Sequence, residues 1–487
     1  MKAIKYTIIL IILVAQIENS SLANNNNILI PKIGDTSSRF MSISQENKLG
    51  DIIYSQILGS FRLINDPLIT GYIQMLGNRL LMSDYNSSIK YRFLVANHYS
   101  INAFATPGGV IVINSGLITK ANTEAELASV LAHEIAHVKS RHLSRMHEES
   151  SEVNITTALT VIATVIAGMY DTSTLGKAIV TGQNIKASKQ ISFRREHEKE
   201  ADRLAINILA RANISPYAMS DFFKTLAKEN NNNEGLEFLR SHPVTKNRIV
   251  ETQNLAAQYK GNFTNDSFTY QFISARVSMQ NLDTKIFIDN YKFNPNDTIK
   301  FPSKIINDYA YGLALTKEKK YKKSIIVLSS LLELLKSKDQ LYTIRNYINI
   351  ALSEAYLNNN NHEKAIDILQ NLNNIYPTDS SILYYLSDAY IKKGNYKKVL
   401  KLLIPYIIEH RDHRLVIKVS EAAYKLKEVS LGHEYRGDYL KITGKLNSAI
   451  KFYRLALKYN MKGTTIDKRV LSKIKEIEKL QESKEIL

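Results

Sequence analysis

Two histidines and a glutamate stand at a spacing that can bind a metal ion and use it. His133, Glu134 and His137 form an HExxH motif, written His-Glu-Ile-Ala-His in this chain. On a helix, four residues make slightly more than one turn, so both imidazoles point the same way, about 40° apart around the axis. Such a pair can bind zinc, and Glu134 lies beside it, where its carboxylate can act on an attacking water.

The residues around this motif predict the helix that it requires. Thr123 is a candidate N-cap, and Glu126 stands at the third helical position, which is the pattern of a capping box. Apolar residues then recur at helical spacing and predict one buried stripe. They are Leu127, Leu131, Ile135 and Val138.

A catalytic zinc ion needs a third protein ligand and one open position. The chain has no cysteine, so the ligand must be a histidine or a carboxylate. Glu198 is the candidate, and Asp202 follows one turn later on the same helical face. One carboxylate can bind the metal while the other fixes the tautomer of a ligand histidine. Spacing alone leaves three alternatives open. They are Glu196, His197 and Glu200.

Residue composition and hydrophobic periodicity divide the chain into five segments. Residues 1–23 contain two lysines, then a short uncharged run, and then small residues that end at Ala23. This pattern is typical of a cleaved signal peptide. The alternative is a permanent N-terminal anchor, with the protein facing the periplasm. Residues 24–42 predict a flexible mature N-terminus. Residues 43–259 predict mixed structure, with an amphipathic helix over 49–81 and a strand over 91–96. Residues 260–302 predict a linker, and residues 303–487 predict helices alone.

A 34-residue period marks the C-terminal segment. Ala355-Tyr356, Ala389-Tyr390 and Ala423-Tyr424 recur at that interval, which is the period of tetratricopeptide repeats. In such repeats the small residue lets two helices approach, and the aromatic residue fills the gap to the next hairpin. We expect about four repeats with a concave surface that binds clients. The alternative is that the repeats only stabilise the N-terminal domain.

Composition excludes several classes of protein. With 44% apolar residues among 487, the chain can bury two or three cores and is not disordered. The net charge of +18 comes from lysines spread along the chain, without an Arg-rich arm or a nucleic-acid motif. We therefore expect no nucleic-acid partner. The uncharged run 155–169 predicts a lid or peripheral membrane contact, or alternatively a buried core helix.

Several motifs together resemble a known family. The string from Asn102 to Gly109, the run Val110–Asn114, HEIAH, and Glu198-Lys199-Glu200-Ala201-Asp202 resemble the zinc metallopeptidases that include the HtpX and CAAX-prenyl proteases. With an export signal and tetratricopeptide repeats, the architecture is similar to the BepA-type periplasmic branch. The resemblance implies an α+β zincin-like metallopeptidase domain, mainly helical with a small sheet, followed by an all-α tetratricopeptide solenoid. It also implies one Zn²⁺ per chain, with Glu198 as third ligand and Asp202 behind a ligand.

The resemblance draws attention to three further features. His242 would take the fourth zinc position and hold the site closed, unless it is a surface residue beside Pro243. Arg248 would orient substrate or stabilise the oxyanion, or alternatively form a surface ion pair. The strand Val110, Ile111, Val112 and Ile113 would lie at the edge of the site and pair with an extended substrate.

These features predict an exported endopeptidase that cleaves unfolded or misassembled envelope proteins. Its repeats would bind clients, and the resemblance implies contact with the outer-membrane assembly machinery. The alternative function is a chaperone or assembly scaffold whose zinc site is latent. The remaining histidines, among them His98 and His142, are expected at the surface or in repeat packing.

Overall fold

The computed structural model describes residues 41–82, 88–149, 186–229, 238–239, 242–291, 293, 303–336, 342–460 and 463–486. The predicted signal peptide, nearly all of the predicted flexible N-terminus and the apolar run 155–169 lie outside these residues. Among the described helices, none has both the length and the apolar character needed to cross a membrane.

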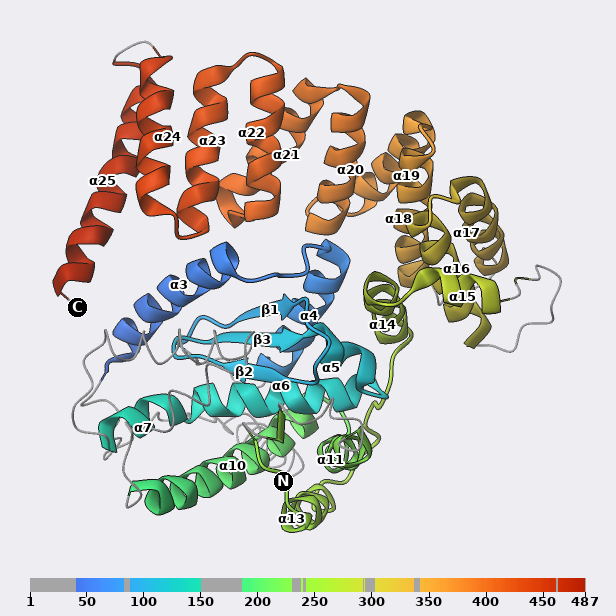
Figure 1. The fold of residues 1–487 in the computed structure, drawn as a ribbon, viewed down its shortest axis with the longest axis vertical. Helices are drawn as coiled ribbons and strands as arrows, with labels where there is room; N and C mark the ends of the chain where they lie inside the picture. The colour runs from blue at the N-terminus through green and yellow to red at the C-terminus, as the bar shows by residue number, and fades with distance from the viewer. Residues whose placement is uncertain are drawn as a thin grey trace, which may run out of the picture.

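A three-stranded sheet lies at the centre of the N-terminal domain (Figure 1). Its strands are β1 (Arg92–Ala96), β2 (Ala103–Ala105) and β3 (Val110–Asn114), in the order β1-β3-β2. β3 pairs in parallel with β1, Arg92 opposite Val110, and antiparallel with β2, Ala103 opposite Ile113. Gly108 and Gly109 both have positive φ, 76° and 83°, so glycine is required in the turn from β2 to β3.

Helices cover both faces of this sheet. Val110 and Val112 pack with α3 (Ile43–Ser60), whereas Ile111 and Ile113 belong to the core shared with α4 (Pro67–Leu81) and α6 (Glu124–Lys139). Side chains alternate between the two faces of a strand, so an unbroken apolar strand is buried on both sides. The expected single helix over 49–81 is wrong. Asp66 caps α4 with Pro67 in its first turn, and α3 ends at Ser60.

The remaining helices of this domain lie mostly below the sheet in Figure 1, where α10 runs beside α6. They are α5 (Ser115–Lys120), α7 (His142–Glu149), α10 (Lys186–Arg211), α11 (Ala218–Glu229) and α13 (Lys246–Ala256).

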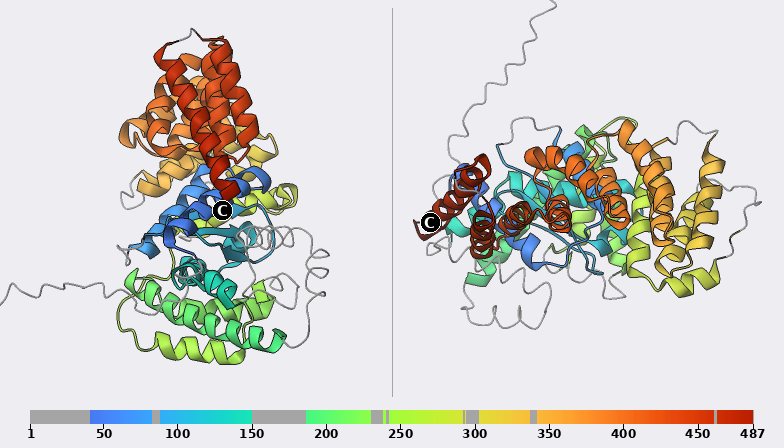
Figure 2. Two further views of the ribbon diagram at one scale, coloured as in Figure 1. Left: turned by 90° about the vertical axis from the view of Figure 1, so that its left-hand side faces the viewer. Right: turned by 90° about the horizontal axis from the view of Figure 1, so that it is seen from above.

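Ten helices in the described C-terminal part form five consecutive hairpins, which arch over α3 and α4 (Figure 2). The hairpins are α16 (Ser303–Lys317) with α17 (Tyr321–Leu335), α18 (Tyr342–Asn358) with α19 (His362–Ile375), α20 (Ser380–Lys393) with α21 (Tyr396–His410), α22 (His413–Lys425) with α23 (Val429–Ile442), and α24 (Leu446–Lys458) with α25 (Thr465–Ile486). Ala355, Ala389 and Ala423 are fully buried, as the repeat pattern predicts. The predicted fold class, a small-sheet metallopeptidase domain followed by a helical repeat array, is confirmed.

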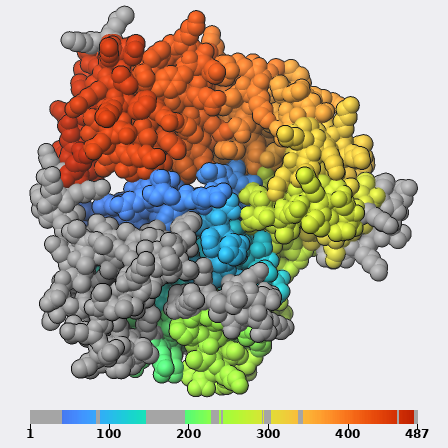
Figure 3. Space-filling model, viewed as in Figure 1, coloured from blue at the N-terminus to red at the C-terminus, as the bar shows by residue number. Residues whose placement is uncertain are grey.

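The segment predicted to be a linker contains two helices, α14 (Phe268–Asn281) and α15 (Thr284–Asn290). α14 packs against α4 and α5 on one side and against α16 and α18 on the other. Its residue Arg276 is 4% exposed and bonds Asp66 of the N-terminal domain as well as Glu354 and Tyr385 of the repeats. The two parts therefore form one continuous body, with the blue α3 against the orange and red repeats in Figure 3.

Candidate metal centre

α6 carries the HExxH residues in the interior of the N-terminal domain. The side chain of Thr123 accepts from the backbone N–H of Glu126 and begins the helix, as predicted. His133 and Glu134 are buried, and the Nε2 atoms of His133 and His137 lie 3.0 Å apart. Their side chains point to the same place because four residues nearly complete one turn.

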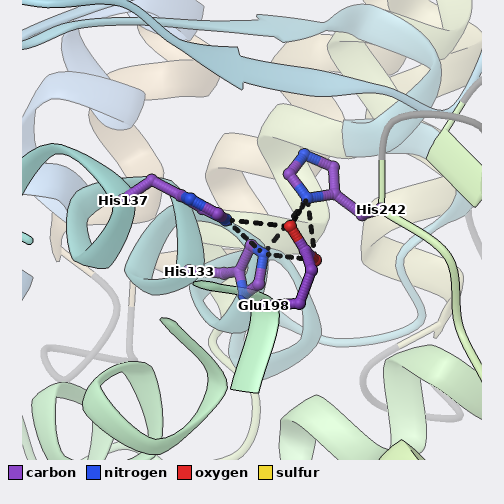
Figure 4. Close-up of side chains that lie close together, drawn as sticks. All are labelled: His133, His137, Glu198 and His242. Atoms are coloured by element: carbon purple, nitrogen blue, oxygen red, sulfur yellow. Dashed lines mark hydrogen bonds and ion pairs between the residues drawn. The ribbon is translucent and has the colours of Figure 1, made fainter. Parts of the chain in front are cut away.

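Glu198 of α10 and His242 complete the cluster (Figure 4). The Glu198 carboxylate lies 3.4 Å from His133 Nε2 and 3.3 Å from His137 Nε2. His242 Nδ1 lies 3.0 Å from Glu198 Oε1. One ligand atom from each of the four residues lies within 4.8 Å of the other three. These side chains come from two helices and a separate segment, and together they could hold one metal ion.

Burial and charge set the protonation of this cluster. Burial lowers the pKa of His137 to about 3, so its imidazole is neutral. Burial also acts to lower the pKa of His133, but hydrogen bonds to Asp202 and Glu198 outweigh it and raise the pKa to about 10. Burial acts to raise the pKa of Glu198, but the charge of His242 and hydrogen bonds from the histidines hold it well below its usual range. Glu198 is therefore an ionised carboxylate among imidazoles, and it can donate an electron pair to a metal ion.

Glu134 is the buried carboxylate on the other side of the cluster. Burial raises its pKa above the ordinary value, and a backbone hydrogen bond from Ala105 opposes that rise. His242 Nε2 lies 3.4 Å from Glu134 Oε1, and that oxygen makes no hydrogen bond among the described residues. A buried carboxylate oxygen without a donor can accept a proton from a water beside it.

Asp202 and Arg248 support the cluster from behind. Asp202 Oδ1 lies 3.0 Å from His133 Nδ1, the nitrogen that faces away from Glu198. Arg248 is 5% exposed and donates from Nε and Nη2 to Asp202, both at 2.8 Å, while Nη1 lies 3.0 Å from Glu198 and donates to the Pro243 carbonyl. The alternative of a surface ion pair is wrong, because Arg248 is buried. The expected contact with substrate or oxyanion stays a prediction. Its guanidinium is committed to two buried carboxylates.

The strand predicted at the edge of the site is a central strand. Val110, Ile111, Val112 and Ile113 are fully buried, and β3 is paired on both sides. β-branched residues without polar alternation are typical of a strand covered on both faces, so this pattern argued against an edge. β1 and β2 are the two edge strands of the described sheet, and Ala105 of β2 forms a backbone hydrogen bond with Glu134.

His142 and His197 adjoin the cluster, although His142 was expected to have no part in a site. His142 is 2% exposed, and its Nδ1 lies 2.9 Å from His137 Nδ1. Its ring stacks on that of His197, with centroids 4.1 Å apart. Burial lowers the pKa of both imidazoles, that of His197 to about 4. A straight helix would point residues 137 and 142 in different directions, so the sequence carried no signal for this contact.

The donors suit zinc. Zinc binds imidazole nitrogen and carboxylate oxygen, and three protein ligands with a further position are typical of its catalytic sites. His133, His137 and Glu198 could supply such a set, and His242 offers a fourth ligand atom within 4.8 Å of the other three. Among the described residues, no group donates a hydrogen bond to Glu134 Oε1 beside them, which fits a site that handles a water.

Comparison with known proteins supports this interpretation. Residues 67–256 match the family model described as Peptidase family M48. The chain is similar to the beta-barrel assembly-enhancing proteases of Yersinia pestis, 38% identical over 251 residues, and Escherichia coli K12, 35% identical over 251 residues; each match covers 51% of this chain and 51% of the relative. It is also 25% identical over 213 residues to the mitochondrial metalloendopeptidase OMA1 of Schizosaccharomyces pombe, covering 43% of this chain and 60% of that protein. The chain thus matches about half the length of these bacterial relatives.

Proposed function

We propose that this chain is a zinc-dependent endopeptidase that hydrolyses peptide bonds of unfolded or misassembled envelope proteins, and the match of residues 67–256 to the model of peptidase family M48 supports this proposal. The observation that carries the proposal is the meeting of His133, His137 and Glu198 next to the buried Glu134. Three donors and a neighbouring base are the parts that metal-assisted hydrolysis needs.

Each residue has one task in this reaction. His133, His137 and Glu198 would hold the zinc ion. When bound, zinc supplies a Lewis acid that polarises the scissile carbonyl. Glu134 takes the proton of the attacking water at its free oxygen and gives it to the nitrogen of the leaving amine. Its burial raises its pKa, which makes the carboxylate a better base for that transfer.

The substrate would lie as an extended strand beside β2. This strand is short and is paired only with β3 among the described strands, so its outer backbone groups can bond a peptide. A backbone hydrogen bond from Ala105 connects that strand to Glu134, so a peptide paired with β2 would lie near the base. Main-chain pairing recognises no particular side chain, so selectivity is for unfolded segments.

The repeats would hold the client. Stacked helical hairpins present long surfaces that bind protein segments. A cleft lies where the repeats meet α4, and it is lined by acidic and tyrosine side chains of both parts. They include Asp66, Glu354, Tyr384, Tyr385 and Asp388. The inner face is thus partly used for contact with the metallopeptidase domain, through α20 on α4.

The cellular role follows from the names of the bacterial relatives. Both are called beta-barrel assembly-enhancing proteases. We propose the same setting here: export to the periplasm and quality control of outer-membrane protein assembly, in contact with the assembly machinery. Peripheral membrane contact through residues 155–169 belongs to this proposal as well.

One observation favours a second function, that of a chaperone with a latent site. His242 lies within 3.4 Å of Glu134 and 3.0 Å of Glu198, so its imidazole takes up the space that an attacking water needs. In this state the repeats would bind clients without cleavage, and departure of His242 would start hydrolysis.

Glu134→Gln separates the two functions, because it removes the base and keeps the size of the side chain. The endopeptidase proposal expects wild-type protein to cleave unfolded casein and the variant to lose on the order of 10³-fold in rate. Complementation of a deletion strain is the second measurement. If the variant restores barrel assembly fully and the wild type never cleaves, the protein acts as a scaffold.

A further inference from the structure

A second set of side chains stands behind His137, on the side away from Glu198. His142 Nδ1 lies 2.9 Å from His137 Nδ1, and His142 Nε2 lies 3.2 Å from Glu200 Oε2. Arg145 Nη1 lies 3.2 Å from the same Glu200 oxygen and holds it from outside. The Glu200 carboxylate, the His142 imidazole and the His137 imidazole therefore form a line, and His137 at its end is a proposed metal ligand.

The chemistry of these groups fixes the direction of the hydrogen bonds. A carboxylate accepts, so the Nε2–H of His142 donates to Glu200. A neutral imidazole carries one N–H, which leaves His142 Nδ1 as an acceptor. His137 Nδ1 must then carry its own proton and donate. The lone pair of His137 therefore lies on Nε2, the atom that faces Glu198 and His133.

The backbone is bent to make this contact. Arg141 has φ of 52°, in the left-handed region that non-glycine residues rarely adopt, and it separates α6 from α7. Its guanidinium bonds the buried Glu46 of α3 at 3.0 Å. This ion pair stabilises the strained turn that brings His142 back onto His137. The ring of His197 then stacks on His142 with an interplanar angle of 10° and fixes its plane.

We propose that His142 and Glu200 are positioning residues that hold His137 in the tautomer and orientation required to bind zinc. This inference rests on the proposed function, because it assigns a role to His142 only if His137 is a ligand. Asp202 stands in the same relation to the other imidazole, since it lies 3.0 Å from His133 Nδ1. Each of the two imidazoles thus has a polar side chain close behind its Nδ1, at 3.0 Å for His133 and at 2.9 Å for His137.

The test compares three variants of the full chain by zinc affinity, measured by competition with a chromophoric chelator. His142→Phe keeps the flat ring on His197 and removes both nitrogens, so zinc affinity should fall about 10- to 100-fold. His142→Asn keeps an acceptor near the position of Nδ1 and should recover most of that loss. His98→Asn is the control, because His98 bonds Ser100 in the same domain and does not belong to the group of four possible ligands.

A second measurement reports on the tautomer without metal. In protein labelled at histidine carbon Cδ2, the His137 signal should show the Nδ1–H form in wild type and a mixture of tautomers in His142→Phe. Circular dichroism verifies that each variant folds. Wild-type zinc affinity and an unchanged His137 tautomer in a folded His142→Phe would overturn the proposal. If the wild-type protein itself binds no zinc, the proposed function is refuted instead.

Discussion

Arg276→Met tests whether one buried side chain couples the metallopeptidase domain to the repeats. Arg276 lies 2.6 Å from Asp66 Oδ2 and 2.8 Å from Glu354 Oε2, and it donates to the hydroxyl of Tyr385 at 2.7 Å. Methionine fills similar space but leaves two carboxylates without their cation. Removing one partner of a buried ion pair costs about 3–5 kcal/mol, because the remaining charge is buried and uncompensated.

The assay is calorimetric unfolding of the full chain. We expect wild type to unfold in one transition and Arg276→Met to unfold earlier, with the repeats and the metallopeptidase domain separating into two transitions. Lys224→Met is the control, because Lys224 forms an exposed ion pair with Asp221, worth about 0–1 kcal/mol.

A double variant checks the cause. If the loss comes from orphaned charge, adding Glu354→Gln to Arg276→Met should restore part of the stability, since it removes one of the two unpaired carboxylates. A single wild-type-like transition in Arg276→Met, or strictly additive losses in the double variant, would refute the reasoning.

Three further predictions test other parts of the structure. Gly77→Ala should destabilise the protein by about 1–3 kcal/mol in urea unfolding, because the new Cβ would lie 2.3 Å from the Phe93 ring; an unchanged midpoint would show that the ring can move. His242→Ala should raise casein cleavage on the order of tenfold, about 1.4 kcal/mol in the barrier, and equal rates would exclude a latent site. Burial acts to raise the pKa of Glu434, but Arg469 and Lys473 outweigh it and lower this pKa below the value of 4.5 in the unfolded chain. The ion pairs of Glu434 therefore stabilise the folded protein fully at pH values above 4.5, and this stabilisation is lost as the pH falls through the lowered pKa. Glu434→Gln should therefore cost about 1–3 kcal/mol at pH 7 and much less at pH 3, and a loss independent of pH would contradict this.

The part of the site that could be predicted is the part in which spacing along one helix decides geometry. His133, Glu134 and His137 lie together because any helix would place them so, and the capping pattern at Thr123 indicated that helix. Glu198 and Asp202 followed from the need for a third ligand and from one-turn spacing on α10. Spacing alone could not separate Glu198 from Glu200. In the structure, Glu200 forms a hydrogen bond with His142 instead.

The rest depends on how separate elements meet, which local patterns do not report. The turn at Arg141 brings His142 to His137, and it depends on Glu46 from a helix that begins about a hundred residues earlier. Arg248 faces two buried carboxylates because α13 packs on α10. The role of β3 could have been predicted: an unbroken β-branched run indicates a strand covered on both faces.

Metal content of the purified full chain tests the central claim most directly. Elemental analysis should find one equivalent of zinc in wild type and less than about a tenth of that in His137→Ala, because the two donors that remain of the three, His133 and Glu198, cannot hold the ion alone. His98→Asn should keep the full equivalent. A folded His137→Ala that retains one equivalent of zinc would contradict the claim that His133, His137 and Glu198 bind the same ion.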